Sequence, residues 1–170
     1  MKKQGFTLIE LMVVIVIMGI LAAVAVPKLF GMIAKSKSSE VGPAAGEYVK
    51  LQDAYVSELN KYVGSFKMIG YKMDQGNVFQ YADALTAAAT SGSTEISAKG
   101  SETASWKATS QVALNDCDGS STWVLFTQKA ADGNGLKWTA GIKEKGVSSA
   151  GTDADPDCLM LTPSFKSLAK

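Results

Sequence analysis

The hydrophobic positions of the chain are concentrated near its N-terminus, in a run that extends from Phe6 to Phe30. Within these 25 residues the only charged side chains are those of Glu10 and Lys28. A helix rises about 1.5 Å per residue, so this run would form a helix of roughly 37 Å, long enough to cross a bilayer. The pattern therefore predicts a membrane-spanning helix over residues 6–30.

Glu10 is unusual in this setting, because a carboxylate inside hydrocarbon costs about 2.5–3.5 kcal/mol on insertion scales. An ordinary single-span anchor for a monomeric binding domain leaves this residue unexplained. A secretory signal that is removed after Ala25 also matches the pattern, with Lys2 and Lys3 as its basic region. However, the apolar run is longer than the usual apolar region of about 7–15 residues, and the helical pattern continues past Ala25. These features favour a retained helix.

Past Pro27 the pattern becomes that of an amphipathic helix. Apolar side chains recur at steps of three and four residues, which indicates one face packed on a core: Val41, Ala44, Tyr48, Leu51, Tyr55, Leu59 and Tyr62. Other faces carry Lys50, Gln52, Asp53, Glu58 and Lys61. We expect this helix to pack on a β-sheet, to bend at Gly42–Pro43 and to end near Tyr62, with Gly64 as the stop signal.

The middle of the chain has a weaker pattern. Phe66–Tyr71 suits a short strand or a loop, and Phe79–Ala89 has a helical composition. Thr90–Ser105 is rich in Ser, Thr and Gly, which is typical of turns or short edge strands.

The last third has the alternating pattern of β-strands. Three strands are predicted, at Trp106–Leu114, Thr122–Lys129 and Leu136–Lys143. Asp132–Gly135 has the composition of a hairpin turn between the last two. In the third strand one face is apolar, with Leu136, Trp138, Ala140 and Ile142. Three antiparallel strands over a helix make a small core, so the expected fold class is α+β.

Composition excludes several classes of function. The formal net charge is +1, and all 17 basic residues are lysines, with no arginine and no histidine. Histidine is the usual base of nucleophilic triads and a common zinc ligand. The guanidinium group of arginine binds phosphate and guanine through paired hydrogen bonds. Phosphate-binding loops, nucleophile elbows and C-x-x-C pairs are also absent. The sequence therefore predicts neither an enzyme nor a cofactor, and no nucleic-acid partner is expected.

The basic leader Lys2–Gly5 is followed by Phe6–Glu10 and by the apolar run that continues to Pro27. This N-terminus resembles that of a type IV pilin precursor or of a type II secretion pseudopilin. The resemblance is loose to about residue 63 and absent as sequence beyond. It implies cleavage by a prepilin peptidase after Gly5, methylation of the new N-terminal Phe6, retention of the helix, and the ladle-shaped pilin fold.

This resemblance gives Glu10 a role. Cleavage after Gly5 would create a positive amine on Phe6, four residues from Glu10 on the same helical face. In a filament Glu10 could meet the Phe6 amine of a neighbouring subunit and so set the register, because a wrong stagger buries an unpaired carboxylate. Thr7 is either a further contact for this pair or a polar group that satisfies the helix end.

Gly19 and Pro27 are the other candidates in the apolar helix. Proline removes a backbone hydrogen bond and kinks a helix. One interpretation is a simple bend at Pro27. In similar pilins the stretch between these positions can lose helicity when the filament forms, so Gly19–Pro27 is also a candidate for local melting.

The two cysteines, Cys117 and Cys158, belong to the exported part that the resemblance implies. Because that compartment is oxidising, we expect them to pair, and the closed loop would contribute roughly 4 kcal/mol. Many type IV pilins have a disulfide-bounded C-terminal region, although here twelve residues follow the second cysteine.

Aspartates near both cysteines raise the question of calcium, because oxygen ligands at alternate positions suit this ion. Asp116 and Asp118 flank the first cysteine, and Asp153, Asp155 and Asp157 precede the second. The latter three are the calcium candidates, but they lack the glycine and distal glutamate of an EF-hand loop. Solvated acidic turns are the favoured interpretation, and no metal is expected.

The sequence analysis thus predicts five segments: a leader (1–5), a membrane or filament-core helix (6–30), an amphipathic helix of the head (31–63), a variable connection (64–105) and a disulfide-bounded antiparallel sheet (106–170). The predicted function is that of a structural subunit, which polymerises into a type IV pilus for adhesion or motility. Its expected partners are further copies of itself, the prepilin peptidase and the pilus assembly machinery. The precursor is expected in the bacterial inner membrane and the assembled subunit on the cell surface. The alternative is a pseudopilin of a periplasmic pseudopilus for protein export.

Overall fold

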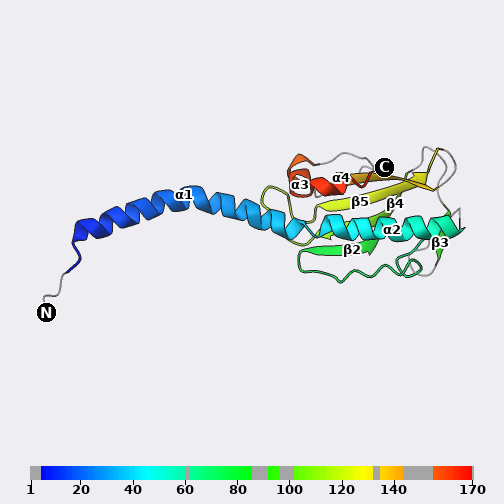
Figure 1. The fold of residues 1–170 in the computed structure, drawn as a ribbon, viewed down its shortest axis with the longest axis horizontal. Helices are drawn as coiled ribbons and strands as arrows, with labels where there is room; N and C mark the ends of the chain where they lie inside the picture. The colour runs from blue at the N-terminus through cyan, green and yellow to red at the C-terminus, as the bar shows by residue number, and fades with distance from the viewer. Residues whose placement is uncertain are drawn as a thin grey trace.

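The computed structural model of the chain describes residues 5–59, 62–85, 92–95, 102–131, 135–143 and 155–169. The N-terminal helix α1 (Leu8–Ser38) projects from a head that contains all the other elements (Figure 1). This is the α+β arrangement that the sequence predicted, with the shape of a ladle.

Helix α1 confirms the predicted helix and extends it to Ser38. It is continuous through Gly19 and Pro27. Its curved ribbon shows that the helix is bent rather than straight (Figure 1). A bend is what a proline inside a helix produces, because its ring clashes with the carbonyl four residues earlier and it has no N–H to donate.

The break between the two long helices lies earlier than expected. Residues Ser39 and Glu40 separate α1 from α2 (Val41–Leu59), whereas we predicted a bend at Gly42–Pro43. That prediction was wrong, because Pro43 falls in the first turn of α2. A backbone N–H has no intrahelical partner there, so proline removes nothing that the helix uses.

The buried face of α2 differs in part from the predicted stripe. Val41, Ala44 and Tyr48 are buried as expected, but Leu59 is 48% exposed. Gln52, which we placed on a polar face, is completely buried. The full buried set is Val41, Gly42, Ala44, Ala45, Tyr48, Val49, Gln52 and Val56.

Gln52 can be buried because its side-chain amide makes hydrogen bonds to the backbone of a strand residue. Its Oε1 accepts a hydrogen bond from the Gly64 backbone N–H at 3.1 Å, and its Nε2 donates to the Gly64 carbonyl and to the Tyr48 hydroxyl. Tyr62 and Gly64 therefore belong to strand β1 (Tyr62–Gly64), and the predicted helix end at Tyr62 was wrong. A Cβ at Gly64 would lie 2.9 Å from Ile69 and 3.0 Å from Tyr55, so the residue is a packing glycine, not a helix stop.

In the described part of the chain the strands form two antiparallel sheets. The larger has the order β2 (Phe79–Asp83), β4 (Thr103–Ser110), β5 (Thr122–Lys129) and β6 (Leu136–Lys143), and the smaller pairs β1 with β3 (Ser93–Glu95). Strands β5 and β6 have the predicted bounds. Lys129 pairs with Leu136, as a hairpin requires, and residues 132–134 of the predicted turn lie outside the described residues.

Two predictions for the middle of the chain were wrong. Phe79–Ala89 was expected to be helical, but Phe79–Asp83 is a strand whose inward side chains, Phe79 and Tyr81, are buried; residues 86–89 lie outside the described residues. Strand β4 begins at Thr103, before the predicted Trp106, and ends at Ser110. An irregularity between Ala104 and Trp106 shifts its register against β5, which an alternating pattern does not reveal.

The core lies between α2 and the larger sheet, and three tryptophans dominate it. Trp106, Trp123 and Trp138 are each at most 2% exposed. Every indole N–H donates a hydrogen bond: to the Tyr71 hydroxyl at 3.1 Å, to Thr162 Oγ1 at 2.8 Å and to Asp53 Oδ1 at 2.9 Å, respectively. Burial of these large side chains therefore leaves no indole donor unsatisfied.

Two short helices close the head after the sheet. Helix α3 (Pro156–Leu161) and helix α4 (Pro163–Lys166) lie near the point where α1 meets the head (Figure 1). Phe165 of α4 is fully buried and packs on Trp106, with ring centroids 6.1 Å apart. The segment after Cys158 thus contributes Phe165 to the core.

Candidate functional site: the exposed helix and its junction with the head

The most prominent surface of the molecule is the exposed part of α1. From Leu8 to Ile33 its large apolar side chains are 41–79% exposed. An 18-residue window has a mean hydropathy of 2.9 and none of it is buried, so by length and composition the helix can cross a membrane. Soluble monomers rarely expose an apolar surface of this size, and its presence marks an interface with lipid or protein.

At the start of this surface Glu10 and Thr7 form a capping box. The carboxylate of Glu10 accepts hydrogen bonds from the Thr7 backbone N–H at 2.8 Å and from the Thr7 hydroxyl at 2.6 Å. The Glu10 N–H donates in turn to Thr7 Oγ1 at 3.4 Å. In the single chain Thr7 therefore satisfies the helix end, which is one of its two predicted roles. The predicted contact between Glu10 and the Phe6 amine of a neighbour requires a second subunit.

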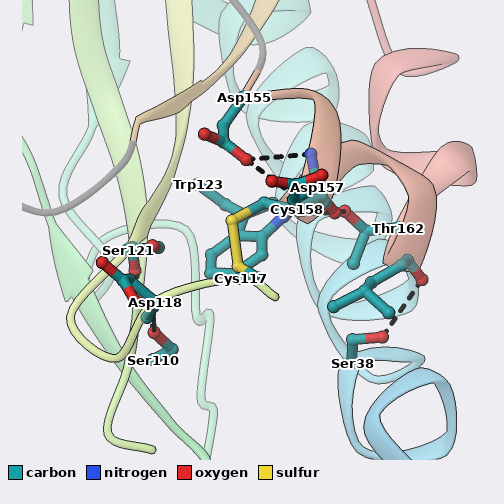
Figure 2. Close-up of a disulfide and its surroundings, with 11 residues drawn as sticks. Ser38, Ser110, Cys117, Asp118, Ser121, Trp123, Asp155, Asp157, Cys158 and Thr162 are labelled. Carbon is teal, nitrogen blue, oxygen red and sulfur yellow. Dashed lines mark hydrogen bonds between the residues drawn. A yellow bond between two sulfur atoms is a disulfide. The ribbon is translucent and has the colours of Figure 1, made fainter. Parts of the chain in front are cut away.

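At the other end of the surface α1 enters the head. Ala34 and Ser38 are buried there, and the Ser38 hydroxyl donates to the Leu161 carbonyl of α3 at 3.0 Å (Figure 2). Polar hydrogen bonding and close packing thus fix the end of α1 against the C-terminal segment.

A disulfide lies beside this junction. Cys117 and Cys158 are bonded, with their Cα atoms 4.8 Å apart, and both are buried (Figure 2). This confirms the predicted pair. Cys117 ends a tight turn in which it exchanges two backbone hydrogen bonds with Leu114, at 2.9 and 3.1 Å. Asn115 in this turn has φ 57°, a conformation that asparagine tolerates better than most residues. The bond therefore joins this turn to α3.

The aspartates near the disulfide have different roles. Asp155 caps α3: its Oδ1 accepts from the backbone N–H groups of Asp157 at 3.0 Å and Cys158 at 2.9 Å (Figure 2). Asp157 is exposed on the first turn of α3, and Asp153 lies outside the described residues. Within the described ranges there is no group of three His, Cys, Asp or Glu side chains placed to hold a metal ion. Neither the expectation of solvated acidic turns nor the calcium alternative is tested, since Asp153 is not described.

Sequence reasoning missed the C-terminal part of this junction. Thr162 accepts the Trp123 indole N–H and donates to the Cys158 carbonyl at 3.2 Å, so it connects the sheet to α3. The segment Asp155–Pro156 carried a usable signal, because an aspartate followed by proline is a typical helix start.

The chain is similar to known pilins. A family model described as the prokaryotic N-terminal methylation motif matches residues 1–26. The type IV major pilin protein PilA of Myxococcus xanthus is 39% identical over 80 residues, 47% of this chain and 36% of that protein. The type II secretion system core protein G of Pectobacterium carotovorum is 41% identical over 64 residues, 36% of this chain and 39% of that protein.

A third relative matches much more of the head. The fimbrial protein EcpC of Eikenella corrodens is 32% identical over 123 residues, which are 71% of this chain and 80% of that protein. The match to the Myxococcus protein, by contrast, spans about a third of its length. Together with the motif at the N-terminus and the α+β fold on a long apolar helix, the extent of the fimbrial match establishes the family: the chain belongs to the type IV pilins.

Proposed function

We propose that this chain is the structural subunit of a type IV pilus, which polymerises through α1 into a filament on the cell surface. The observation that carries the proposal is the exposure of the whole apolar half of α1 outside a well-packed head. Such a helix requires a nonaqueous environment, and both a bilayer and a bundle of identical helices supply one. Adhesion or motility is then a property of the fibre.

In this proposal a prepilin peptidase cleaves after Gly5, and Phe6 becomes a methylated N-terminus. Phe6 is 83% exposed and precedes α1, so cleavage leaves the helix and its Thr7 cap in place. In the filament the Phe6 amine of one subunit meets the Glu10 carboxylate of its neighbour. Removing either partner leaves a buried charge without compensation, and this penalty enforces the register.

Gly19 and Pro27 have a role in the same filament. Helix α1 is continuous across both residues in the single chain. Assembly would melt the stretch between them, since glycine and proline are the weakest helix formers and β-branched valines lie between them. A filament map with unbroken helix from Gly19 to Pro27 would contradict this part of the proposal.

Before assembly the subunit resides in the bacterial inner membrane, with its head on the outer side, where the disulfide forms. The pilus assembly machinery then extracts it. The second candidate is a pseudopilin, favoured by the similarity to a type II secretion core protein over 64 residues. The fimbrial similarity is longer, at 123 residues, and includes much of the head, so the pilus is preferred.

The test is intact-protein mass spectrometry on two fractions of native cells, the material sheared from the surface and the inner membrane. A chain that starts at methylated Phe6, is two hydrogens lighter for the disulfide and is abundant in the sheared fraction supports the pilus. The same processed chain found only in the membrane supports the pseudopilin. A chain that starts at Met1 or Val26 overturns both.

A further inference from the structure

The junction between α1 and the head contains a groove, and the proposed function leaves it without a role. The groove has a volume of about 280 Å³. Gly31 and Lys35 of α1 form one wall, Asn115 and Asp116 of the tight turn form the second, and Asp157 and Met160 of α3 form the third. The disulfide joins the second wall to the third.

The groove combines an apolar floor with an acidic rim. Buried Leu114 lines it, and Met160 at its edge is 76% exposed. Asp116 and Asp157 are both exposed, and the Asp116 carboxylate accepts one hydrogen bond, from the Asn115 side chain at 2.6 Å. Across the ranges that the structure describes, neither carboxylate is in an ion pair. Lys35 also lines the groove and offsets one of the two negative charges, so one negative charge remains in excess. The site therefore suits a further cation on a long apolar stem.

Lys28 has this chemistry and lies in an otherwise apolar stretch of α1. A lysine can lay its alkyl chain along apolar surface while its ammonium group reaches a polar rim. Lys28 does not line the groove of its own subunit. Because the filament consists of identical chains, every groove has a Lys28 from a neighbouring subunit available to it.

We propose that in the filament Lys28 of one subunit docks into this groove of its neighbour, with its ammonium group between Asp116 and Asp157. The proposal rests on the proposed function, because it requires assembly in the register that Glu10 and the Phe6 amine set.

Helical periodicity places Lys28 on the side of α1 that lines the groove. Gly31 and Lys35 follow Lys28 by three and seven residues, so they lie about 60° and 20° from it around the helix axis. This relation involves only residues after Pro27, so it does not depend on whether Gly19–Pro27 stays helical. The side of α1 that carries Lys28 is therefore also the side on which the groove opens.

The register brings the partners to the same height. When the Phe6 amine of the neighbour is level with Glu10, the neighbour is displaced by four residues, about 6 Å, toward the head of the first subunit. Its Lys28 is then level with Met32 of the first subunit, next to the groove wall at Gly31. The reverse displacement would leave Lys28 beside Val24, where no acidic group is available.

Zero-length cross-linking of sheared filaments tests the proposal. A carbodiimide activates an aspartate carboxyl, and a lysine amine then displaces the activating group, so an amide forms with net loss of water and the carbodiimide becomes a urea. Cells would co-produce a Lys28→Gln chain and an Asp116→Asn/Asp157→Asn chain. In these mixed filaments a bond between Lys28 and Asp116 or Asp157 can form only between subunits.

The expected result is a dimer whose tryptic peptides join Lys28 to Asp116 or Asp157. Filaments that contain both chains but give no such peptide overturn the proposal and leave the proposed function intact. If the sheared material contains neither variant chain and also no wild-type chain in the parallel experiment, the proposed function is overturned as well.

Filament yield gives a second readout. Lys28→Glu is expected to lower the amount of sheared filament several-fold, and combining it with Asp116→Lys and Asp157→Lys is expected to restore it. Lys50→Glu, a charge reversal at an exposed position of α2, serves as the matched control. A Lys28→Glu yield equal to that of Lys50→Glu would contradict the docking of Lys28.

Discussion

The hydroxyl of Ser38 in α1 donates a hydrogen bond to the backbone carbonyl of Leu161 in α3, across 123 positions of sequence. The same hydroxyl lies 3.0 Å from the Lys35 carbonyl one turn earlier in α1. Ser38 is fully buried, so its hydroxyl depends on these two carbonyls and not on water. This residue therefore fixes the direction in which α1 leaves the head.

Replacement of Ser38 by alanine should destabilise the head. The substitution leaves the carbonyl of half-buried Leu161 without this donor, and loss of a hydrogen bond costs about 0.5–1.5 kcal/mol. Denaturant unfolding of the detergent-solubilised chain would measure the change. Ser36→Ala, at an exposed position one half-turn earlier, is the control and should change stability little. Equal effects of the two variants would argue against a special role for Ser38.

Glu10→Val should leave membrane insertion and cleavage unchanged and should nearly abolish filaments. The apolar replacement suits the bilayer, but it removes the partner of the neighbour's Phe6 amine. The measurement compares processed subunit in the membrane with pilin in the sheared fraction. Thr7→Val is the control: it removes the hydroxyl from the capping box and costs about 1 kcal/mol of helix stability, but it retains the carboxylate. Abundant Glu10→Val filaments would refute the register role.

Loss of the disulfide should loosen the C-terminal part of the head. A Cys117→Ser/Cys158→Ser chain is expected to lose about 2–5 kcal/mol of stability. Because Thr162 follows α3 and accepts a hydrogen bond from the Trp123 indole, the combined tryptophan fluorescence should change as solvent reaches Trp123. Limited proteolysis with and without reductant would show whether cleavage concentrates after Lys166. Unchanged proteolysis and fluorescence in the reduced chain would mean that packing alone holds α3.

The head should lose stability as the pH rises from 10 to 12. Burial raises the pKa of Tyr71 from 10.0 to about 12. The unfolded chain therefore releases this proton first, and the free energy of unfolding falls between the two values. Burial also raises the pKa of Tyr48 and of Tyr81 above the usual tyrosine value, which adds to the effect.

Tyr71→Phe isolates this contribution. The variant should be less stable at neutral pH, since Trp106 Nε1–H loses its acceptor, but its stability should decline less steeply above pH 10. Unfolding at a series of alkaline pH values measures the slope. An unchanged slope would assign the alkaline loss to the other tyrosines.

Periodicity predicted the parts of this fold whose burial follows a simple rule. The uniform apolar run gave α1, and strict alternation at Trp138, Ala140 and Ile142 gave β6 with its inward face. Periodicity failed where tertiary contacts determine the secondary structure or the burial of a residue. The stretch around Ala82 has helical composition, yet Phe79 and Tyr81 fill the core only when the segment is a strand. Gln52 looks like a surface residue until Gly64 is placed beside it.

The functional site also has one part that the sequence reveals and one part that only the folded structure brings together. Glu10 could be found in the sequence because an acid in an apolar helix requires an explanation. The groove could not, since Gly31, Asp116 and Asp157 become neighbours only after the sheet has folded and the disulfide has formed. The residues after Cys158 were likewise overlooked, although Phe165 is among the most deeply buried side chains.

Helix α1 is connected to α2 by the short Ser39–Glu40 link, and this connection has a mechanical consequence. Tension carried by the filament core enters each head through this link and through the neighbouring contact of Ser38 with Leu161. Helix α2 lies lengthwise on the sheet (Figure 1), and it contributes Val41 and Tyr48 to the centre of the core. A pull on α1 is therefore a shear that loads all contacts of α2 together, not a peeling force that breaks them in turn. The head should therefore withstand a pulling force that would detach a helix bound only at one edge of the sheet.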